Sequence, residues 1–322
     1  KELLIQCNMK TKVRIGILGC ANFVKRYGIP SFKAIPNAEI VSIASRDIEK
    51  AKAWAKEHNI KTGETYDSLI NNPNVDAVHI PLPNSMHKEW ILKAVRKGKH
   101  VICEKSLAVS FADAKEIIDE CKKHNVVLFE NFMCGYHPQH QKVLSLISEG
   151  VIGNVFVFRS FFGFPKMNAD NIRYQKNLDG GVLNENGAYV AFMARKMIGK
   201  EPLSVTATLH YEEIDIRGTL TLDFGAGVTA LLAFDLDAVY QNNYSLWGSK
   251  GIIHVNRAYS IPSDMKPDIE CVTNENMQEK REKVDAPAIN HFELIFSDFC
   301  NTILHKDTEQ EKIDTTYEGI LN

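Results

Sequence analysis

The sequence predicts an α/β protein in which a doubly wound parallel sheet is followed by an α+β part with a large open, mostly antiparallel sheet. Short apolar runs alternate with helix-length segments up to about residue 130, which is the rhythm of parallel strands joined by helices. From residue 203 to 255, strand-like runs instead follow one another with glycine breaks. The length of 322 residues also exceeds what a single core usually accommodates. We therefore predict two domains, residues 1–130 and 131–322.

The first domain is expected to alternate regularly between strands and helices. The expected strands are residues 13–18, 40–44, 77–80, 100–103 and 126–129. The expected helices are residues 48–58, 86–97 and 111–123. This order predicts right-handed crossovers between parallel strands.

The second domain is expected to begin with a helix at 138–148, a long strand at 154–163 and a helix at 182–198. Residues 224–227 read Phe-Gly-Ala-Gly between two alternating runs, which indicates a β-hairpin. A last helix is expected at 287–304. An open sheet needs its exposed apolar face covered, so we expect a homodimer or homotetramer formed through this sheet.

Composition excludes several classes of protein. The formal net charge is -2, which does not favour a nucleic-acid partner. Apolar runs are far shorter than the ~20 residues of a membrane span, and the N-terminus does not resemble a signal peptide. The seven cysteines are odd in number and lack Cys-x-x-Cys spacing, which favours a reducing compartment, and we expect a cytoplasmic protein.

One histidine pair has a spacing typical of metal ligands. His137 and His140 are three residues apart, but Pro138 between them fits the first position of a helix. No third ligand is evident nearby. We therefore expect a helix start here and no metal.

The turn after the first strand has the position of a dinucleotide-binding fingerprint. Residues 19–24 read Gly-Cys-Ala-Asn-Phe-Val, which keeps only the first glycine of G-x-G-x-x-G. Backbone N–H groups and a helix dipole at this place would hold a pyrophosphate, so we expect a Rossmann domain here. An ordinary strand–helix turn is the alternative. The candidate cofactor contacts in this turn are Gly19, Cys20, Ala21, Asn22 and Phe23.

The end of the second strand predicts which dinucleotide is bound. Sites that prefer NAD carry an acidic residue there, but this strand ends in Ser45 and Arg46. A hydroxyl and a guanidinium would bind a 2′-phosphate that an acid would repel, so we expect NADP(H). Asp47 comes too late for the ribose role, and either Ser45 or Asp47 is also expected to cap the following helix.

Two further segments carry chemistry-bearing residues. Glu104 and Lys105 end the strand at 100–103, and ligands bind at the carboxyl ends of such strands. Residues 180–189 read Gly-Gly-Val-Leu-Asn-Glu-Asn-Gly-Ala-Tyr, which places Glu185 and Tyr189 on one face of a helix start. Together these segments resemble the glucose–fructose oxidoreductase and inositol dehydrogenase family (Gfo/Idh/MocA), whose marks are Glu-Lys-Pro and Gly-Gly-x-Leu-x-Asp-x-Gly-x-His/Tyr.

Within that family the sequence is most similar to NADP-dependent nucleotide-sugar 3-ketoreductases of deoxysugar biosynthesis. The stretches 18–21, 44–47, 130–133, 137–140, 162–165 and 170–174 carry this resemblance. It implies an NADPH-dependent oxidoreductase that transfers a hydride to the keto group of a nucleotide-linked sugar. It also implies that residues 1–130 bind the dinucleotide, that residues 131–322 bind substrate and form the oligomer, and that the last helix packs back on the first domain.

The resemblance implies a role for individual residues. Lys105 would be the active-site lysine and Tyr189 the proton donor, as catalytic residues. Further expected cofactor contacts are Pro81, Leu82, Asn84, His87, Glu104, Lys105 and Arg173. Expected substrate contacts are Lys105, His137, Glu185 and Tyr189. Arg173 could contact the nicotinamide or the substrate phosphates, or could merely brace its loop.

The expected chemistry is hydride attack on a ketone carbon with protonation of its oxygen. An unperturbed tyrosine has a pKa near ~10, which suits an acid, and a nearby ammonium would lower that pKa and polarise the carbonyl. Two residues depart from the family pattern. Ser106 replaces a proline, so we expect a trans bond before it. Glu185 replaces an aspartate, which lengthens the side chain by a methylene.

Two other functions remain open at this point. The first is an NAD(P)-dependent dehydrogenase of a free sugar or cyclic polyol. What distinguishes it from a reductase of a nucleotide-linked sugar is a site that binds the diphosphate. The residues available for such a site are Arg173, His137, Lys166 and Arg159. The second is a non-catalytic NAD(P)-binding regulator. The presence of both Lys105 and Tyr189 argues against it.

Overall fold

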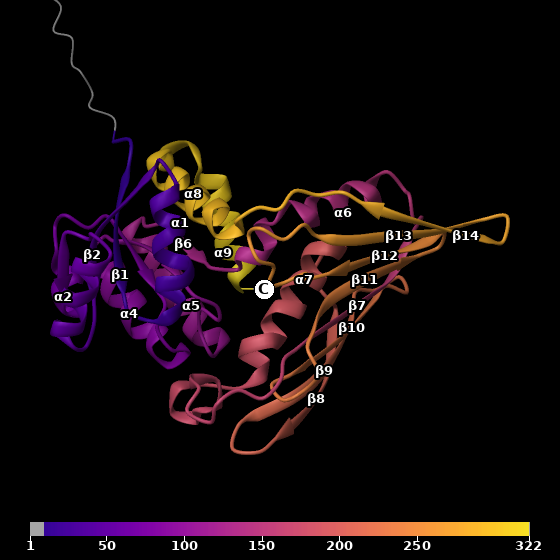
Figure 1. Ribbon diagram of the computed structural model, residues 1–322, viewed down its shortest axis with the longest axis horizontal. Helices are drawn as coiled ribbons and strands as arrows, with labels where there is room; N and C mark the ends of the chain where they lie inside the picture. Colours follow the sequence, from indigo (N-terminus) through magenta and orange to yellow (C-terminus); the bar gives the residue numbers. More distant parts are fainter. Residues whose placement is uncertain (1–9, 322) are drawn as a thin grey trace, which may run out of the picture.

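The computed structural model describes residues 10–321, apart from the side chain of Glu275, and contains two sheets side by side (Figure 1). The sequence predicts no signal peptide at the N-terminus, and this prediction concerns residues 1–9, which lie outside the described part. One sheet is parallel and six-stranded, and the other is eight-stranded and mostly antiparallel. The predicted fold class is therefore confirmed. The domain boundary at residue 130 stays a prediction, although the first sheet does end at Glu130.

The six-stranded sheet has the order β3-β2-β1-β4-β5-β6 and all its pairings are parallel. Its strands are β1 (Val13–Leu18), β2 (Ala38–Ala44), β3 (Thr62–Glu64), β4 (Ala77–Ile80), β5 (His100–Cys103) and β6 (Leu128–Glu130). The chain reverses direction across the sheet between β1 and β4. Such a switch point opens a crevice at the carboxyl ends of the strands, which is where α/β proteins bind ligands.

Helices connect the parallel strands as predicted. They are α1 (Ile29–Ala34), α2 (Ile48–Glu57), α3 (Tyr66–Asn71), α4 (Asn84–Arg96) and α5 (Phe111–His124). Their starts follow capping chemistry: the Ser110 hydroxyl accepts from Asp113 N at the start of α5, and Thr65 does the same for α3. Two elements were not predicted: β3, the edge strand that pairs with β2, and α3, which leads from β3 to β4.

The eight-stranded sheet has the order β14-β13-β12-β11-β7-β10-β9-β8, and only β10 and β7 pair in parallel. Its strands are β7 (Val155–Gly163), β8 (Ser204–Tyr211), β9 (Asp215–Asp223), β10 (Thr229–Asp235), β11 (Gln241–Gly248), β12 (Gly251–Asn256), β13 (Asp268–Glu275) and β14 (Gln278–Val284). The predicted hairpin at 224–227 joins β9 to β10, with Ala226 at a φ of 54° between two glycines of positive φ.

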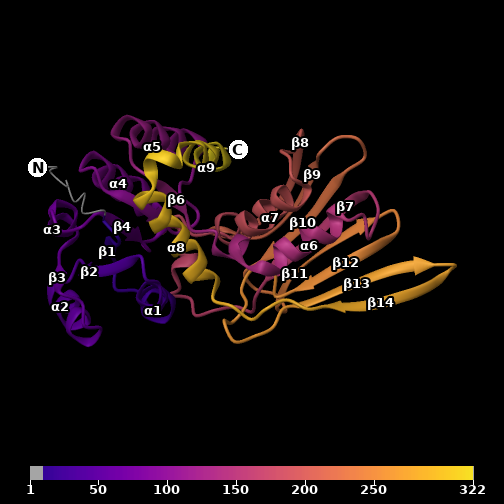
Figure 2. The same ribbon diagram turned by 90° about the horizontal axis from the view of Figure 1, so that it is seen from above.

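One face of this sheet is covered by helices. Figure 2 shows α6 (Pro138–Ser148) and α7 (Ala188–Ile198) over that face. The strand register places Phe158, Ala230 and Leu246 beside one another on it, and all are fully buried. Burial of this apolar face fixes the sheet against the helices.

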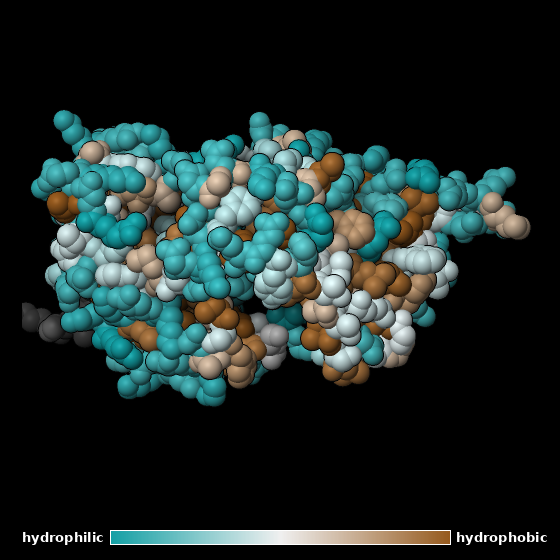
Figure 3. Space-filling view, turned by 90° about the horizontal axis from the view of Figure 1, so that it is seen from below, coloured by the Kyte–Doolittle hydropathy of each residue, from teal (hydrophilic) through white to brown (hydrophobic). Residues whose placement is uncertain are grey.

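No helix of residues 10–321 covers the opposite face of the sheet. Figure 3 views the molecule from that side and shows brown, apolar areas over the half that holds the eight-stranded sheet. The same register places Val157 beside Trp247, with Leu231 two residues along β10 on the same face. Trp247 is 54% exposed and Leu231 43% exposed.

The end of the chain returns to the first sheet. Helix α8 (His291–Leu304) packs on α1, where Phe296 stacks on Phe32 with ring centroids 4.0 Å apart. Asn37 Nδ2 donates to Asn301 Oδ1 at 2.7 Å across the same contact. A further helix that the sequence analysis did not predict, α9 (Gln310–Leu321), lies against α5 and β6. Among residues 10–321 no helix is long and apolar enough to cross a membrane.

Candidate active site

Three charged side chains meet between the two sheets. Lys105 lies two residues after β5, and its Nζ donates to Glu185 Oε2 at 2.9 Å and to the Glu185 carbonyl at 3.3 Å. Arg173 comes from the short helical turn Ile172–Tyr174, and its Nε lies 3.1 Å from the same Oε2. The sequence-predicted Lys105, Glu185 and Arg173 therefore form one cluster.

The carboxylate of Glu185 is held between these two cations in a nearly dry place. Its side chain is 10% exposed, and that of Lys105 is 8% exposed. Burial alone would raise the pKa of Glu185, but the charges of Lys105 and Arg173 hold it below its usual value. The carboxylate stays ionised and fixes the position of the lysine ammonium.

Tyr189, at the second position of α7, lies beside this cluster. Its hydroxyl is directed at Met133 Sδ, at 3.6 Å, and sulfur is a weak acceptor. The Tyr189 ring packs edge-on against Phe132 and Phe162. Lys105 Nζ lies 5.2 Å from the centre of the ring. The hydroxyl thus keeps no strong partner, and a substrate oxygen could take its hydrogen.

The expected lowering of the tyrosine pKa is wrong for this structure. Burial raises the pKa of Tyr189 well above its usual value, and nearby acidic groups add to the effect. The ammonium of Lys105 does not reverse this, because it is bound to Glu185 and faces the ring. The raised pKa keeps the phenol protonated, which suits an acid more than a base.

A glycine turn places Glu185 and Tyr189. Gly181 has a φ of +136°, and a Cβ there would lie 2.1 Å from Asp215 Oδ1. That close approach lets Asp215 Oδ2 accept from Leu183 N at 2.6 Å, which caps the π-helical turn Leu183–Gly187. The turn then runs directly into α7. The predicted helix at 182–198 therefore exists with a wider first turn.

The peptide bond between Lys105 and Ser106 is cis, so the trans bond expected from the missing proline is wrong. The surroundings hold Ser106 from both sides. Its hydroxyl donates to the carbonyl of Asn184 at 2.9 Å, and its own carbonyl lies 2.8 Å from His87 Nδ1. Local sequence could not reveal these tertiary contacts.

The fingerprint turn lies at the carboxyl end of β1. Gly19 has a φ of +132°, and a Cβ there would lie 3.3 Å from Leu82 in the turn after β4. Only glycine adopts this conformation readily. Ala21 is half-buried and Asn22 exposed, and both precede the helical turn Val24–Gly28 that leads into α1. A turn at this place, between the end of a strand and the start of a helix, is where dinucleotide-binding folds hold a pyrophosphate.

The end of β2 has the features expected for a 2′-phosphate. Ser45 is buried and Arg46 exposed. Asp47 is occupied as the N-cap of α2, since its Oδ1 accepts from Glu49 N at 3.0 Å. Asp47 N in turn donates to Ser45 Oγ at 3.2 Å. The acid next to this site is therefore committed to a helix cap.

Other predicted cofactor contacts sit deeper than expected. Both nitrogens of His87 lie 2.8 Å from backbone carbonyls, those of Leu82 and Ser106, and the ring is fully buried. It leaves no polar atom for a cofactor, so His87 connects two loops instead. Asn84 Nδ2 donates to the Asp179 carbonyl at 3.2 Å. Pro81 and Leu82 form the turn after β4 that adjoins Gly19.

Glu104 lies in a network that the sequence analysis did not anticipate. Its Oε1 accepts from Asn131 Nδ2 at 2.6 Å and lies 3.1 Å from His79 Nε2. His79 is inside β4 and Asn131 follows β6, so neighbouring parallel strands bring these side chains together. Nothing in the sequence distinguishes a strand histidine of this kind from a core residue.

His137 is not placed as a simple substrate ligand. It caps α6, with its Nδ1 accepting from Gln139 N at 3.2 Å, and burial lowers its pKa to about 4. Its ring packs edge-on against His291 at the start of α8, 5.9 Å between centroids. His140 instead contacts Tyr244 Oη at 3.0 Å. Within residues 10–321 no group of His, Cys, Asp and Glu could hold a metal ion.

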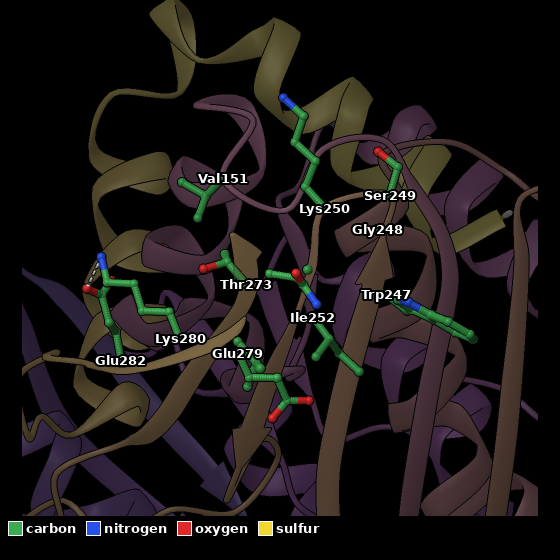
Figure 4. A pocket seen from close by; sticks show the side chains of 13 residues that line it. Val151, Trp247, Gly248, Ser249, Lys250, Ile252, Thr273, Glu279, Lys280 and Glu282 are labelled. Atoms are coloured by element: carbon green, nitrogen blue, oxygen red, sulfur yellow. Dashed lines mark ion pairs between the residues drawn. The ribbon is translucent and has the colours of Figure 1, made fainter. Parts of the chain in front are cut away.

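The second sheet also carries a surface cavity of about 580 Å³, which Figure 4 shows from close by. Strands β11 to β14 form it, with Trp247 on one side and the Lys280–Glu282 ion pair on the other. None of the predicted site residues lines it. We therefore place the candidate active site at the Lys105 cluster and not in this cavity.

Comparison with family models identifies both parts of the chain. Residues 13–132 match the model GFO_IDH_MocA, described as an oxidoreductase family with an NAD-binding Rossmann fold. Residues 140–254 match the GFO/IDH/MocA C-terminal domain.

The chain is also similar to curated oxidoreductases. The dTDP-3,4-didehydro-2,6-dideoxy-alpha-D-glucose 3-reductase of Actinomadura kijaniata is 33% identical over 302 residues, which is 93% of this chain and 90% of the relative. The trans-1,2-dihydrobenzene-1,2-diol dehydrogenase of Xenopus tropicalis is also 33% identical, over 77% of this chain and 73% of the relative.

A solved structure is similar along nearly the whole chain. A 3-ketoreductase from Actinomadura kijaniata, in complex with NADP and TDP-benzene, superposes with a TM-score of 0.89 at 31% identity. The match covers 96% of this chain and 95% of that one. The aldose-aldose oxidoreductase of Caulobacter crescentus superposes with a TM-score of 0.82 at 25% identity, over 96% of this chain and 97% of that one.

Proposed function

The chain belongs to the Gfo/Idh/MocA family of oxidoreductases, and from that premise we propose that it is an NADPH-dependent reductase of a nucleotide-linked 3-ketosugar. The observation that carries the proposal is the buried cluster of Lys105, Glu185 and Arg173 beside the Tyr189 hydroxyl. The similar 3-ketoreductase, solved with NADP and a TDP compound, supports the same cofactor and substrate class.

The residues present fit NADP(H). Gly19 and the following turn offer backbone N–H groups at a helix start, and Ser45 and Arg46 stand where a 2′-phosphate would lie. Asp47, the nearest acid, is turned into the cap of α2. NADPH supplies the hydride when it is bound.

In this proposal Tyr189 protonates the ketone oxygen. Its raised pKa keeps the hydroxyl hydrogen in place until the oxygen acquires charge. The ammonium of Lys105, held by Glu185, stabilises that charge as it develops. The cluster is nearly dry, so these interactions are stronger than they would be in water.

Arg173 is the cation best placed to meet the phosphates of a linked nucleotide. It comes from a loop and its side chain is 34% exposed; its Nε faces Glu185, and its Nη1 donates to Asn171 Oδ1 at 3.4 Å. A guanidinium can bind a carboxylate and a phosphate at the same time, because it has five donors. This favours a nucleotide-linked sugar over a free sugar or polyol.

Two expectations about the whole protein stay predictions. The apolar, uncovered face of the eight-stranded sheet supports a homodimer or homotetramer. The cytoplasmic location and the separate roles of residues 1–130 and 131–322 likewise rest on the sequence and the family.

The experiment that tests the proposal follows NADPH and NADH absorbance with purified protein. The substrates are nucleotide-linked 3-ketosugars, the same sugars without the nucleotide, and free aldoses with NADP⁺. We expect NADPH to be consumed only with the linked ketosugars. Turnover only of free sugars would favour the dehydrogenase, and tight NADPH binding without any turnover would favour the regulator.

A further inference from the structure

The loop that carries Lys105 is attached to the neighbouring strand by a carboxyl group. Glu130 is the last residue of β6 and pairs with Cys103, the last residue of β5. Its Oε1 accepts a hydrogen bond from the backbone N–H of Leu107 at 2.7 Å. Leu107 is only 2% exposed, so water does not readily replace this acceptor.

The other side of the same loop is bound to the C-terminal half. Lys105 Nζ donates to Glu185, and the Ser106 hydroxyl donates to Asn184. Three consecutive residues are thus held by two parts of the chain: Lys105 and Ser106 by residues 184–185, and Leu107 by β6. The position of the ammonium therefore depends on the Leu107 anchor as well as on Glu185.

Glu130 itself faces away from the proposed reaction. It lines a cavity of about 760 Å³ together with Ser106, Leu107 and parts of α5, α7 and α9. Lys105, Glu185 and Tyr189 do not line this cavity. Burial raises the pKa of Glu130 to about 7, although the hydrogen bond from the Leu107 N–H and then the charges of Lys105 and Arg195 lower it. Either protonation state keeps an oxygen that can accept the Leu107 N–H.

We propose that Glu130 is a positioning residue, whose carboxyl oxygen fixes the Leu107 amide and thereby places Lys105 Nζ against Glu185. It touches neither substrate nor cofactor and acts only through the loop. The kinetic part of this inference rests on the proposed reductase function. What matters is an acceptor at the right distance and not a negative charge.

Substitutions at one position separate these requirements. Glu130→Gln keeps an acceptor oxygen of the same reach, Glu130→Asp shortens the side chain by a methylene, and Glu130→Ala removes the acceptor. We expect kcat to fall about 10- to 100-fold in the alanine variant and to fall clearly in the aspartate variant, because misplaced catalytic groups are costly. The glutamine variant should retain kcat within about threefold, since the distance is preserved. KM for NADPH should stay within about twofold in all of them, because Glu130 is outside the cofactor turn.

Thr316→Val is the matched control. Thr316 lines the same cavity from α9, but its hydroxyl bonds only to the Lys312 carbonyl of its own helix. This variant should retain the kcat of the wild type. The unfolding temperature of each variant is measured alongside, so that kinetics are compared well below it.

Hydrogen–deuterium exchange over residues 104–110 gives a readout that needs no substrate. The alanine variant should exchange faster in this segment, and the glutamine variant should match the wild type. If the wild type reduces no linked ketosugar, the proposed function fails while exchange still tests the anchor. The inference is overturned if Glu130→Ala retains kcat, if Glu130→Gln loses as much as Glu130→Ala, or if exchange is the same in all variants.

Discussion

The hydroxyl of Tyr189 is the most specific chemical feature of the site. Phenylalanine in its place keeps the ring contacts with Phe132 and Phe162 and removes only the hydroxyl group. We expect Tyr189→Phe to lower kcat about 10²–10⁴-fold with NADPH affinity unchanged. Steady-state kinetics and a fluorescence titration with NADPH measure the two quantities. A kcat equal to that of the wild type would remove Tyr189 from the mechanism.

Arg46 carries the prediction of cofactor preference. It is exposed at the end of β2 and has no acid beside it that is free to bind a ribose. We expect Arg46→Ala to raise KM for NADPH about 10- to 100-fold, since a charge-assisted contact to the phosphate is lost. KM for NADH serves as the internal control and should change little. An equal change for both cofactors would show that Arg46 does not read the 2′-phosphate.

Glu185 links catalysis to the pH dependence of stability. Its folded-state pKa is lowered by Lys105 and Arg173, against the effect of burial. The ionised carboxylate therefore contributes stability that is present above the unfolded value of ~4.3 and is lost as the pH falls through the folded pKa. Glu185→Gln leaves two cations without their partner and should cost about 3 kcal/mol at pH 7.

Urea unfolding of the wild type and Glu185→Gln at pH 7 and near pH 3.5 tests this prediction. The difference between the two proteins should shrink at the lower pH, because below about 4.3 the carboxyl group binds a proton more readily in the unfolded wild type than in the folded one. A difference that does not depend on pH would argue that the carboxylate is not ionised in the folded protein.

At the scale of elements, the turn at Gly180 and Gly181 determines where the site residues lie. Gly181→Ala combines an unfavourable φ with a contact to Asp215, so we expect a destabilisation well above the ~1–2 kcal/mol of the backbone alone, and a loss of kcat. Gly199→Ala is the matched control, because Gly199 has a φ of +75° in open space. Thermal unfolding of both variants should show a clearly larger effect at Gly181, and equal effects would exclude the steric contact.

Elements with strong local patterns could be predicted from the sequence. The buried strands β1, β4 and β5 have their predicted bounds, and α6 begins at Pro138 as expected. The edge strand β14 has charged side chains at most positions, so it lacks the apolar alternation that indicates a strand. Helix α9 was missed because it is stabilised by packing on the distant α5 and β6, and β3 was missed because its three residues are too few to show an alternating pattern.

The candidate site was predictable where residues follow strands or open helices. Lys105, Glu185 and Tyr189 were singled out in that way and Arg173 through the family resemblance, and the structure brings the four together. His87 was assigned to the cofactor, but it holds two carbonyls instead. Such partners depend on tertiary packing, which a linear pattern does not contain.

At the scale of the whole molecule, each half of the chain contributes different residues to the proposed reaction. The carboxyl ends of the parallel strands face the C-terminal half, and Lys105 from one half meets Glu185 from the other. Helix α8 connects the end of the chain to α1, which ties both halves into one hydrophobic cluster. The reaction therefore requires the intact chain, because neither half alone supplies both the lysine and the tyrosine.

The most direct test of the central claim is the fate of the transferred hydride. Purified protein is incubated with NADPH that carries deuterium at both hydrogens of nicotinamide C4 and with a nucleotide-linked 3-ketosugar, and the product is examined by NMR and mass spectrometry. The account predicts one deuterium at C3 of the sugar for each NADPH oxidised. A product without deuterium at C3, or no oxidation of NADPH with any linked ketosugar, would contradict it.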